Sequence, residues 1–79
     1  MDIRKQIGMR IKELRLLNKL TQETLSHFAQ MDKTYINEVE NGKRNISVIN
    51  LEKVIKALGS NFEFFFSSPI FHPIDDDTI

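Results

Sequence analysis

Two short helical patterns, separated by only a few residues, constrain the fold of this chain more than any other feature. They lie in the segment LTQETLSHFAQMDKTYINEVENG, residues 20–42. Thr21 and Asp32 precede the two patterns, and both are residue types that cap helices by accepting from free backbone N–H groups of the first turn. Gly42 follows the second pattern and can take the left-handed conformation that ends helices. The segment therefore predicts two short helices with a tight turn between them.

The second of these helices separates polar from apolar side chains. At about 100° per residue, its polar residues fall within an arc of about 140°; they are Lys33, Thr34, Asn37, Glu38 and Asn41. Tyr35, Ile36 and Val39 fall on the opposite side. Such polar side chains read base edges and phosphates, and a helix-turn-helix motif lays its second helix in the DNA major groove. A surface helix with a solvated polar face fits the periodicity equally well.

Composition sets the size and class of the protein. The chain has 79 residues, of which 41% are hydrophobic and 28% charged, so it can form one domain with one modest core. It has no apolar run long enough to span a membrane and no secretory signal pattern. It has no cysteine, which excludes disulfides and thiolate metal sites. We therefore expect a cytoplasmic protein without membrane contact.

The charge is divided unevenly along the chain. Net charge is zero, but residues 1–59 hold all eleven lysines and arginines and only seven acidic residues. The remaining acidic residues, Glu63 and Asp75 to Asp77, lie in residues 60–79. The positive excess therefore coincides with the helix pair, which favours a polyanionic partner. A solvated surface is the alternative explanation.

Hydrophobic periodicity predicts four helices, over residues 3–17, 22–29, 33–41 and 48–58. Asp2 and Ser47 are the expected caps of the first and fourth, and Gly59 ends the fourth. The expected buried residues of the first, second and fourth helices are Ile3, Ile7, Ile11 and Leu14; Leu25, Phe28 and Ala29; and Leu51, Val54, Ile55 and Leu58.

The segment SNFEFFF, residues 60–66, fits two structures. Ser60 or Asn61 could cap a fifth helix, and Glu63 completes a capping box with Ser60. Alternating Phe62 and Phe64 would suit a strand. We favour the helix and predict an all-α fold, a compact bundle of four to five short helices with a central helix-turn-helix. Residues 1–68 would form this domain, and residues 69–79 an extended acidic tail, disordered from residue 75 onward.

With the helices placed, the chain resembles the Cro and phage-repressor (XRE-type) helix-turn-helix family over residues 3–66. The resemblance is carried by LTQETL, YINEVENGKR and INLEKVIKALG, in order and at the family's spacing. Within the family, KTYINEVENGKRNIS is most similar to the controller proteins of restriction–modification systems. The resemblance implies a lambda-repressor-like DNA-binding domain that works as a dimer.

The resemblance also implies roles for individual residues. Gln22 would hold a phosphate and brace the second helix of the motif, while Arg15 and Glu40 would form an internal salt bridge. Lys33 and Thr34 would occupy the first base-reading positions. The predicted DNA-binding residues are Thr21, Gln22, Lys33, Thr34, Tyr35, Asn37, Glu38, Asn41, Lys43 and Arg44.

Three of the positions that depart from the family pattern bear on the turns and on the expected DNA face. Gln30 stands where the turn usually has glycine, so that turn requires strain or another geometry. Lys19 replaces the glycine that ends the first helix, and we expect neighbouring Asn18 to take the left-handed conformation instead. Glu38 could accept from a cytosine amino group, but we favour a side chain that points to solvent.

Five of the six phenylalanines lie between Phe62 and Phe71. We expect Phe62 and Phe65 to complete the core. Phe64, Phe66 and Phe71 would then remain as an apolar patch, which typically marks an interface, here that of a homodimer.

Nothing in the sequence indicates catalysis. It shows no nucleophile paired with a base and no glycine-rich phosphate loop, and His27 and His72 lack ligand spacing. We expect no enzyme activity, cofactor or metal.

The predicted function is a sequence-specific transcriptional regulator that binds double-stranded DNA as a homodimer on a two-fold symmetric operator. A restriction–modification controller acting on its own promoter is the favoured sub-case. The leading alternative is an antitoxin that neutralises a toxin and regulates its own operon, and a third is an interaction module that never binds DNA. Expected protein partners are RNA polymerase in the first case and the toxin in the second.

Overall fold

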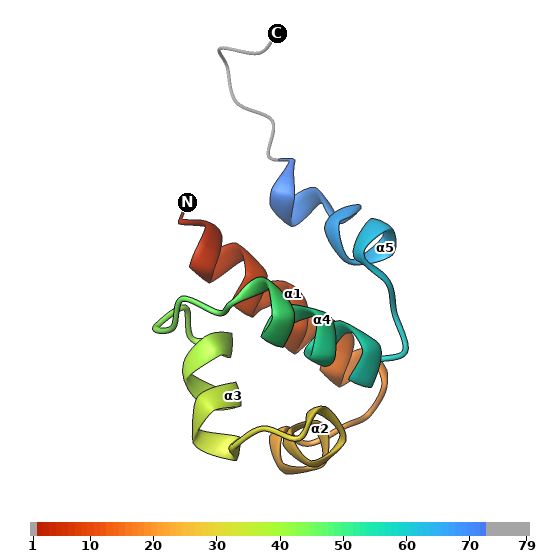
Figure 1. Cartoon of the computed structure of the whole chain (residues 1–79). Coiled ribbons are helices and arrows are strands. Elements are labelled where there is room, and N and C mark those ends of the chain that lie inside the picture. Colours follow the sequence, from red (N-terminus) through yellow and green to blue (C-terminus); the bar gives the residue numbers. More distant parts are fainter. Residues whose placement is uncertain (1, 73–79) are drawn as a thin grey trace, which may run out of the picture.

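A computed structural model describes residues 2–72 of the chain. Within these residues the structure is helical and has no strand (Figure 1). The elements are α1 (Ile3–Leu17), α2 (Gln22–Ala29), α3 (Lys33–Glu40), α4 (Val48–Ala57), α5 (Phe62–Phe66) and a short 3₁₀ helix, η1 (Pro69–Phe71). The all-α prediction is confirmed, and residues 62–66 form the helix rather than the strand.

Side-chain caps begin the helices where the sequence predicts them. Asp2, Thr21, Asp32 and Ser47 each accept from a backbone N–H of the following turn. Asn61, and not Ser60, caps α5 by accepting from the Phe64 N–H at 2.8 Å. Hydrogen bonds from the Arg4 side chain and backbone lower the pKa of Asp2 to about 2, so this cap is a carboxylate at neutral pH.

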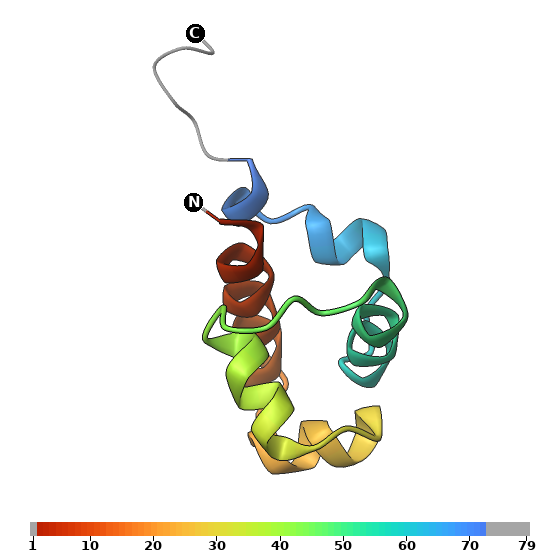
Figure 2. The same cartoon turned by 60° about the vertical axis from the view of Figure 1, so that its left-hand side comes forward.

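The core lies between α1, α2, α3 and α4, and Phe65 of α5 is fully buried in it. Figure 2 shows α5 at one end of these four helices. Its buried residues are Ile11, Leu14, Leu25, Ala29, Ile36, Val39, Leu51, Val54, Ile55, Leu58 and Phe65. Gly8 sets the separation between α1 and α3, because a Cβ there would lie 2.3 Å from the Val39 carbonyl oxygen and 2.6 Å from that of Glu40. The two helix backbones therefore pack directly against each other.

Three predicted core residues lie elsewhere. Ile3 and Phe28 are 54% and 57% exposed, and Phe62 is only partly covered. Ile3 stands in the first turn of α1, outside the fully buried core. The two turns of α2 bury one apolar row, Leu25 with Ala29, and Phe28 falls beside that row.

The turns carry backbone strain at two residues other than glycine. Lys19 and Gln30 have φ of 57° and 56°, a left-handed conformation that costs an L-residue about 1–2 kcal/mol. Of the two alternatives expected for the turn at Gln30, the structure shows backbone strain. The prediction that Asn18 takes the left-handed conformation is wrong. Asn18 has φ −87°, and its Nδ2 donates to the carbonyl oxygens of Leu14 and Leu58.

Residues 69–71 are not part of an extended tail. They form η1, which packs against α1, and Gln6 Nε2 donates to the Ile70 carbonyl oxygen at 2.9 Å. The Phe71 ring lies 4.7 Å from that of Phe66, so apolar contact holds this segment on the bundle. The acidic residues Asp75 to Asp77 lie outside the described part of the chain.

Candidate nucleic-acid interface

The outer face of α3 is open and polar. Ile36 and Val39 are buried against the other helices, whereas Lys33, Thr34 and Asn37 are exposed. Figure 2 shows α3 along one side of the bundle, with α2 crossing beneath it. The apolar and polar sides of this helix are therefore divided as its periodicity predicts.

A buried ion pair fixes α3 to α1. Glu40 accepts from Arg15 Nε at 2.7 Å and from a terminal nitrogen of the same guanidinium at 3.0 Å. The two side chains are only 9% and 2% exposed. Arg15 also donates to the Leu20 carbonyl oxygen at 2.8 Å, just after α1. This bidentate ion pair helps to set the orientation of α3 on the bundle.

Gln22 extends this contact to the exposed face. Its Nε2 donates to Glu40 Oε1 at 3.1 Å, and its Oε1 accepts from Asn37 Nδ2 at 3.2 Å. Asn41 in turn donates to the Asn37 carbonyl oxygen. A continuous chain of hydrogen bonds thus runs from buried Arg15 to exposed Asn37. Gln22 braces α3 as the family resemblance implied, whereas its partner Asn37 was not predicted.

The loop after α3 folds back onto the helix through Arg44. Arg44 Nε donates to Glu38 Oε1 at 3.0 Å, and the guanidinium carbon lies 5.2 Å from the centre of the Tyr35 ring. Tyr35 Oη accepts from Asn50 Nδ2 of α4 at 3.3 Å. The expectation that Glu38 points to solvent holds in part: its side chain is 37% exposed and is ion-paired with Arg44. Asn50 was missed, since only the folded chain brings it to Tyr35.

The basic residues of this region differ in their availability. Among the ion pairs of residues 2–72, Arg44 is matched by Glu38, while Lys33 and Lys43 occur in none. Thr21 and Asp32 are occupied as caps. Within residues 2–72 the surface thus offers two ammonium groups that are in no ion pair, together with the hydroxyl and amide groups of α3.

The predicted dimer residues do not form one exposed patch. Phe64 is 56% exposed, whereas Phe66 and Phe71 are half-buried against each other and against Phe65. Arg10, which the sequence analysis did not single out, lies under Phe64 and donates to the carbonyl oxygens of Phe64 and Phe65.

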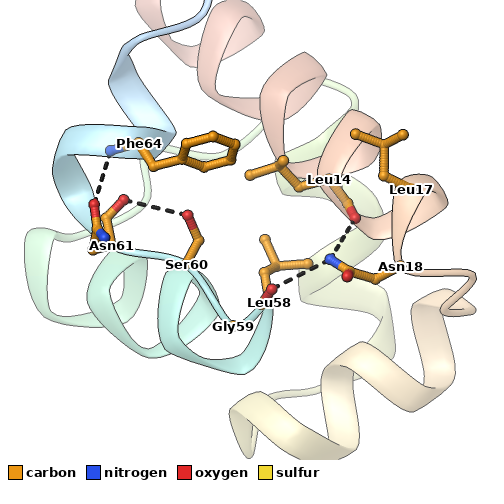
Figure 3. Close-up of a pocket in the computed structure, with 8 residues that line it drawn as sticks. All are labelled: Leu14, Leu17, Asn18, Leu58, Gly59, Ser60, Asn61 and Phe64. Carbon is orange, nitrogen blue, oxygen red and sulfur yellow. Dashed lines mark hydrogen bonds between the residues drawn. The ribbon is translucent and has the colours of Figure 1, made fainter.

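Phe64 borders an open hollow of about 370 Å³ between α1, the segment that connects α4 to α5, and α5 itself (Figure 3). Leu14, Leu17 and Leu58 supply its other apolar side chains, and Leu17 is itself 71% exposed. The exposed apolar surface at this end of the molecule therefore includes Phe64 and Leu17, over this hollow, and the partly exposed Phe62.

Within residues 2–72, none of the helices combines the length and the apolar character that spanning a membrane requires. No group of three or more histidine, aspartate or glutamate side chains is arranged there to hold a metal ion.

The chain is similar to known proteins over most of its length. Residues 11–65 match the helix-turn-helix family. Control protein C.MunI of a Mycoplasma species is 40% identical over 67 residues, 84% of this chain and 90% of that protein. The restriction–modification controller protein C.AhdI of Aeromonas hydrophila superposes with a TM-score of 0.77 at 36% identity, over 80% of this chain and 96% of that one. The controller protein C.Esp1396I was solved as a tetramer on its natural 35-base-pair operator. It superposes with a TM-score of 0.79 at 32% identity, over 84% of this chain and 87% of that one. The chain belongs to the helix-turn-helix family that includes the control proteins of restriction–modification systems.

Proposed function

We propose that the protein is a sequence-specific transcriptional regulator that binds a two-fold symmetric operator as a homodimer, and that it is the controller of a restriction–modification system. The observation that carries this is the open polar face of α3, held in a fixed orientation by the buried pair of Arg15 and Glu40. The similarity to control proteins supports the controller assignment over an antitoxin. The proposed activity is binding without catalysis, in the cytoplasm.

In this proposal α3 enters the major groove. Lys33 and Thr34, exposed on the first turn of α3, read base edges: lysine can donate to guanine O6 and N7, and threonine can contact a base edge or a thymine methyl group. Lys43, in the loop after α3, contacts a phosphate. Phosphate contacts supply most of the affinity, and base contacts supply the specificity.

The dimer places two α3 helices about 34 Å apart, one turn of DNA. We propose that Phe64 packs across the two-fold axis, with Leu17 beside it, while Phe66 and Phe71 pack within the monomer against Phe65 and each other. The oligomeric controller C.Esp1396I on its operator is consistent with such an assembly. RNA polymerase is the protein partner we propose for promoter activation.

Selection of bound sites from a random DNA pool tests the function. A two-fold symmetric consensus is expected, and the absence of any consensus contradicts the proposal. Lys33→Ala should cost about 1–3 kcal/mol on the selected site and much less on random DNA. Lys43→Ala should weaken both equally and reduce the salt slope by about 0.9 per lost phosphate contact. Equal proportional losses on both DNAs for both variants would refute the assignment of roles.

A further inference from the structure

Glu38 is a carboxylate on the face of α3 that we propose meets DNA. It lies one turn after Thr34, beside Asn37 and Asn41. DNA is a polyanion, so an uncompensated carboxylate there would oppose binding to every sequence. A carboxylate at this position is therefore compatible with DNA binding if a cation neutralises its charge and if it accepts a hydrogen bond from the DNA.

Arg44 is the neutralising partner. Its Nε donates to Glu38 Oε1, and its guanidinium lies against the Tyr35 ring. Tyr35 is in turn held by Asn50 of α4. The pair is therefore fixed from the side of the bundle, although both of its side chains are partly exposed, Arg44 by 51% and Glu38 by 37%.

The ion pair uses one nitrogen of Arg44 and one oxygen of Glu38, so the other polar atoms of both side chains can bind DNA. Arg44 uses only Nε here, and among the hydrogen bonds of residues 2–72 its two terminal nitrogens have no acceptor. Those N–H groups can donate to a phosphate while Nε keeps Glu38 in place. Glu38 Oε2 likewise has no donor among the described residues and can accept from a base.

A carboxylate oxygen accepts hydrogen bonds and does not donate them. In the major groove cytosine presents only the N4 amino donor, whereas adenine presents its N6 amino donor beside the N7 acceptor, guanine only acceptors, and thymine an acceptor and a methyl group. Beside adenine the second carboxylate oxygen would face the N7 lone pair, so a carboxylate favours cytosine. We propose that Glu38 reads the N4 amino group of a cytosine at one position of each half-site, with Arg44 as its positioning residue. This inference rests on the proposed function.

The experiment compares site selection by the wild type, Glu38→Ala and Glu38→Gln. The wild type should require cytosine at one position of each half-site. Glu38→Ala should lose that preference and leave the other positions intact. Glu38→Gln should change it to adenine, because glutamine pairs with adenine N6 and N7.

Affinities should change in opposite directions on the two kinds of DNA. Glu38→Ala should bind the selected site about five- to tenfold more weakly, the low end for a lost base contact, and random DNA more tightly, because a negative charge has gone. Glu52→Ala is the matched control: Glu52 is an exposed carboxylate on α4, 3.9 Å from Lys56. Its removal should change both affinities slightly and in the same direction.

Variants of Arg44 test separately whether this residue positions Glu38. Arg44→Ala should weaken binding to all DNA and also lower the cytosine preference at the position that Glu38 reads, while Arg44→Lys should keep part of that preference. If Arg44→Ala weakens all sequences equally, Arg44 does not position Glu38.

Two results overturn the inference: cytosine preference unchanged in Glu38→Ala, or affinity changes equal to those of Glu52→Ala. Both leave the proposed function intact, since the wild type still selects a site. A wild type that selects no site refutes the proposed function itself. Thermal melting of Glu38→Ala should match the wild type, which shows that the variant is folded.

Discussion

Replacing Glu40 by alanine tests the contact on which the interface depends. The change removes the carboxylate that accepts two hydrogen bonds from Arg15 and one from Gln22. The Arg15 guanidinium stays buried, with only the Leu20 carbonyl oxygen left among these acceptors. Glu40→Ala therefore leaves an uncompensated charge inside the fold.

Removing one partner of a buried ion pair costs about 3–5 kcal/mol. At roughly 0.05–0.15 kcal/mol per residue, a chain of this length has about 4–12 kcal/mol in total. The variant should thus lose a large share of its stability. Each kcal/mol corresponds to roughly 4–8 °C in Tm for a domain of this size, so the Tm should fall by more than about 12 °C.

The assay is thermal and urea unfolding followed by circular dichroism. Glu38→Ala is the control, because its pair with Arg44 is exposed and such pairs contribute about 0–1 kcal/mol. Glu40→Gln separates charge from shape, since it keeps an acceptor for Arg15 and should lose less than Glu40→Ala. Equal Tm shifts for Glu40→Ala and Glu38→Ala would refute the reasoning that the buried pair anchors α3.

Two further pairs of variants test the packing and the dimer. Gly8→Ala should cost about 3 kcal/mol, the upper end for overpacking, because its Cβ meets backbone atoms of α3. Gly59→Ala, with φ +70° but open space around its Cβ, should cost only about 1–2 kcal/mol; a lower Tm for Gly59→Ala than for Gly8→Ala would contradict the clash. Phe64→Asp should give a folded monomer in sedimentation, with weaker DNA binding, whereas Phe66→Asp should lower the Tm, because Phe66 packs against the core. An unchanged dimer in Phe64→Asp would place the interface elsewhere.

The helices and their caps were predictable because they depend on neighbouring residues. A cap such as Thr21 needs only a backbone N–H three residues later, and the polar face of α3 follows from a repeat of 3.6 residues. The pair of Arg15 and Glu40 was implied by family resemblance rather than by any local pattern.

The rest depends on residues that only the folded chain brings together. Gly8 carries no sign in the sequence that it faces the backbone of α3. Phe28 has the spacing of a core residue, but less than half of it is covered. Arg10 reaches the end of α5, more than fifty positions later in the chain, and Arg44 meets Glu38 only because the loop folds back. Local sequence patterns therefore predicted the helices. Tertiary contacts determine which of the helices' side chains remain exposed and free to bind a partner.

The hydrogen-bond chain from Arg15 to Asn37 divides the outer face of α3 into two kinds of position. Asn37 is bonded to Gln22, which is bonded to Glu40, so a different side chain at Asn37 would also disturb the contact that orients the helix. Lys33 and Thr34 stand outside this chain and can change without touching it. In the proposed DNA complex, side chains of the first turn of α3 can therefore be exchanged without disturbing the hydrogen bonds through which Asn37, in the second turn, helps to hold the angle of the helix.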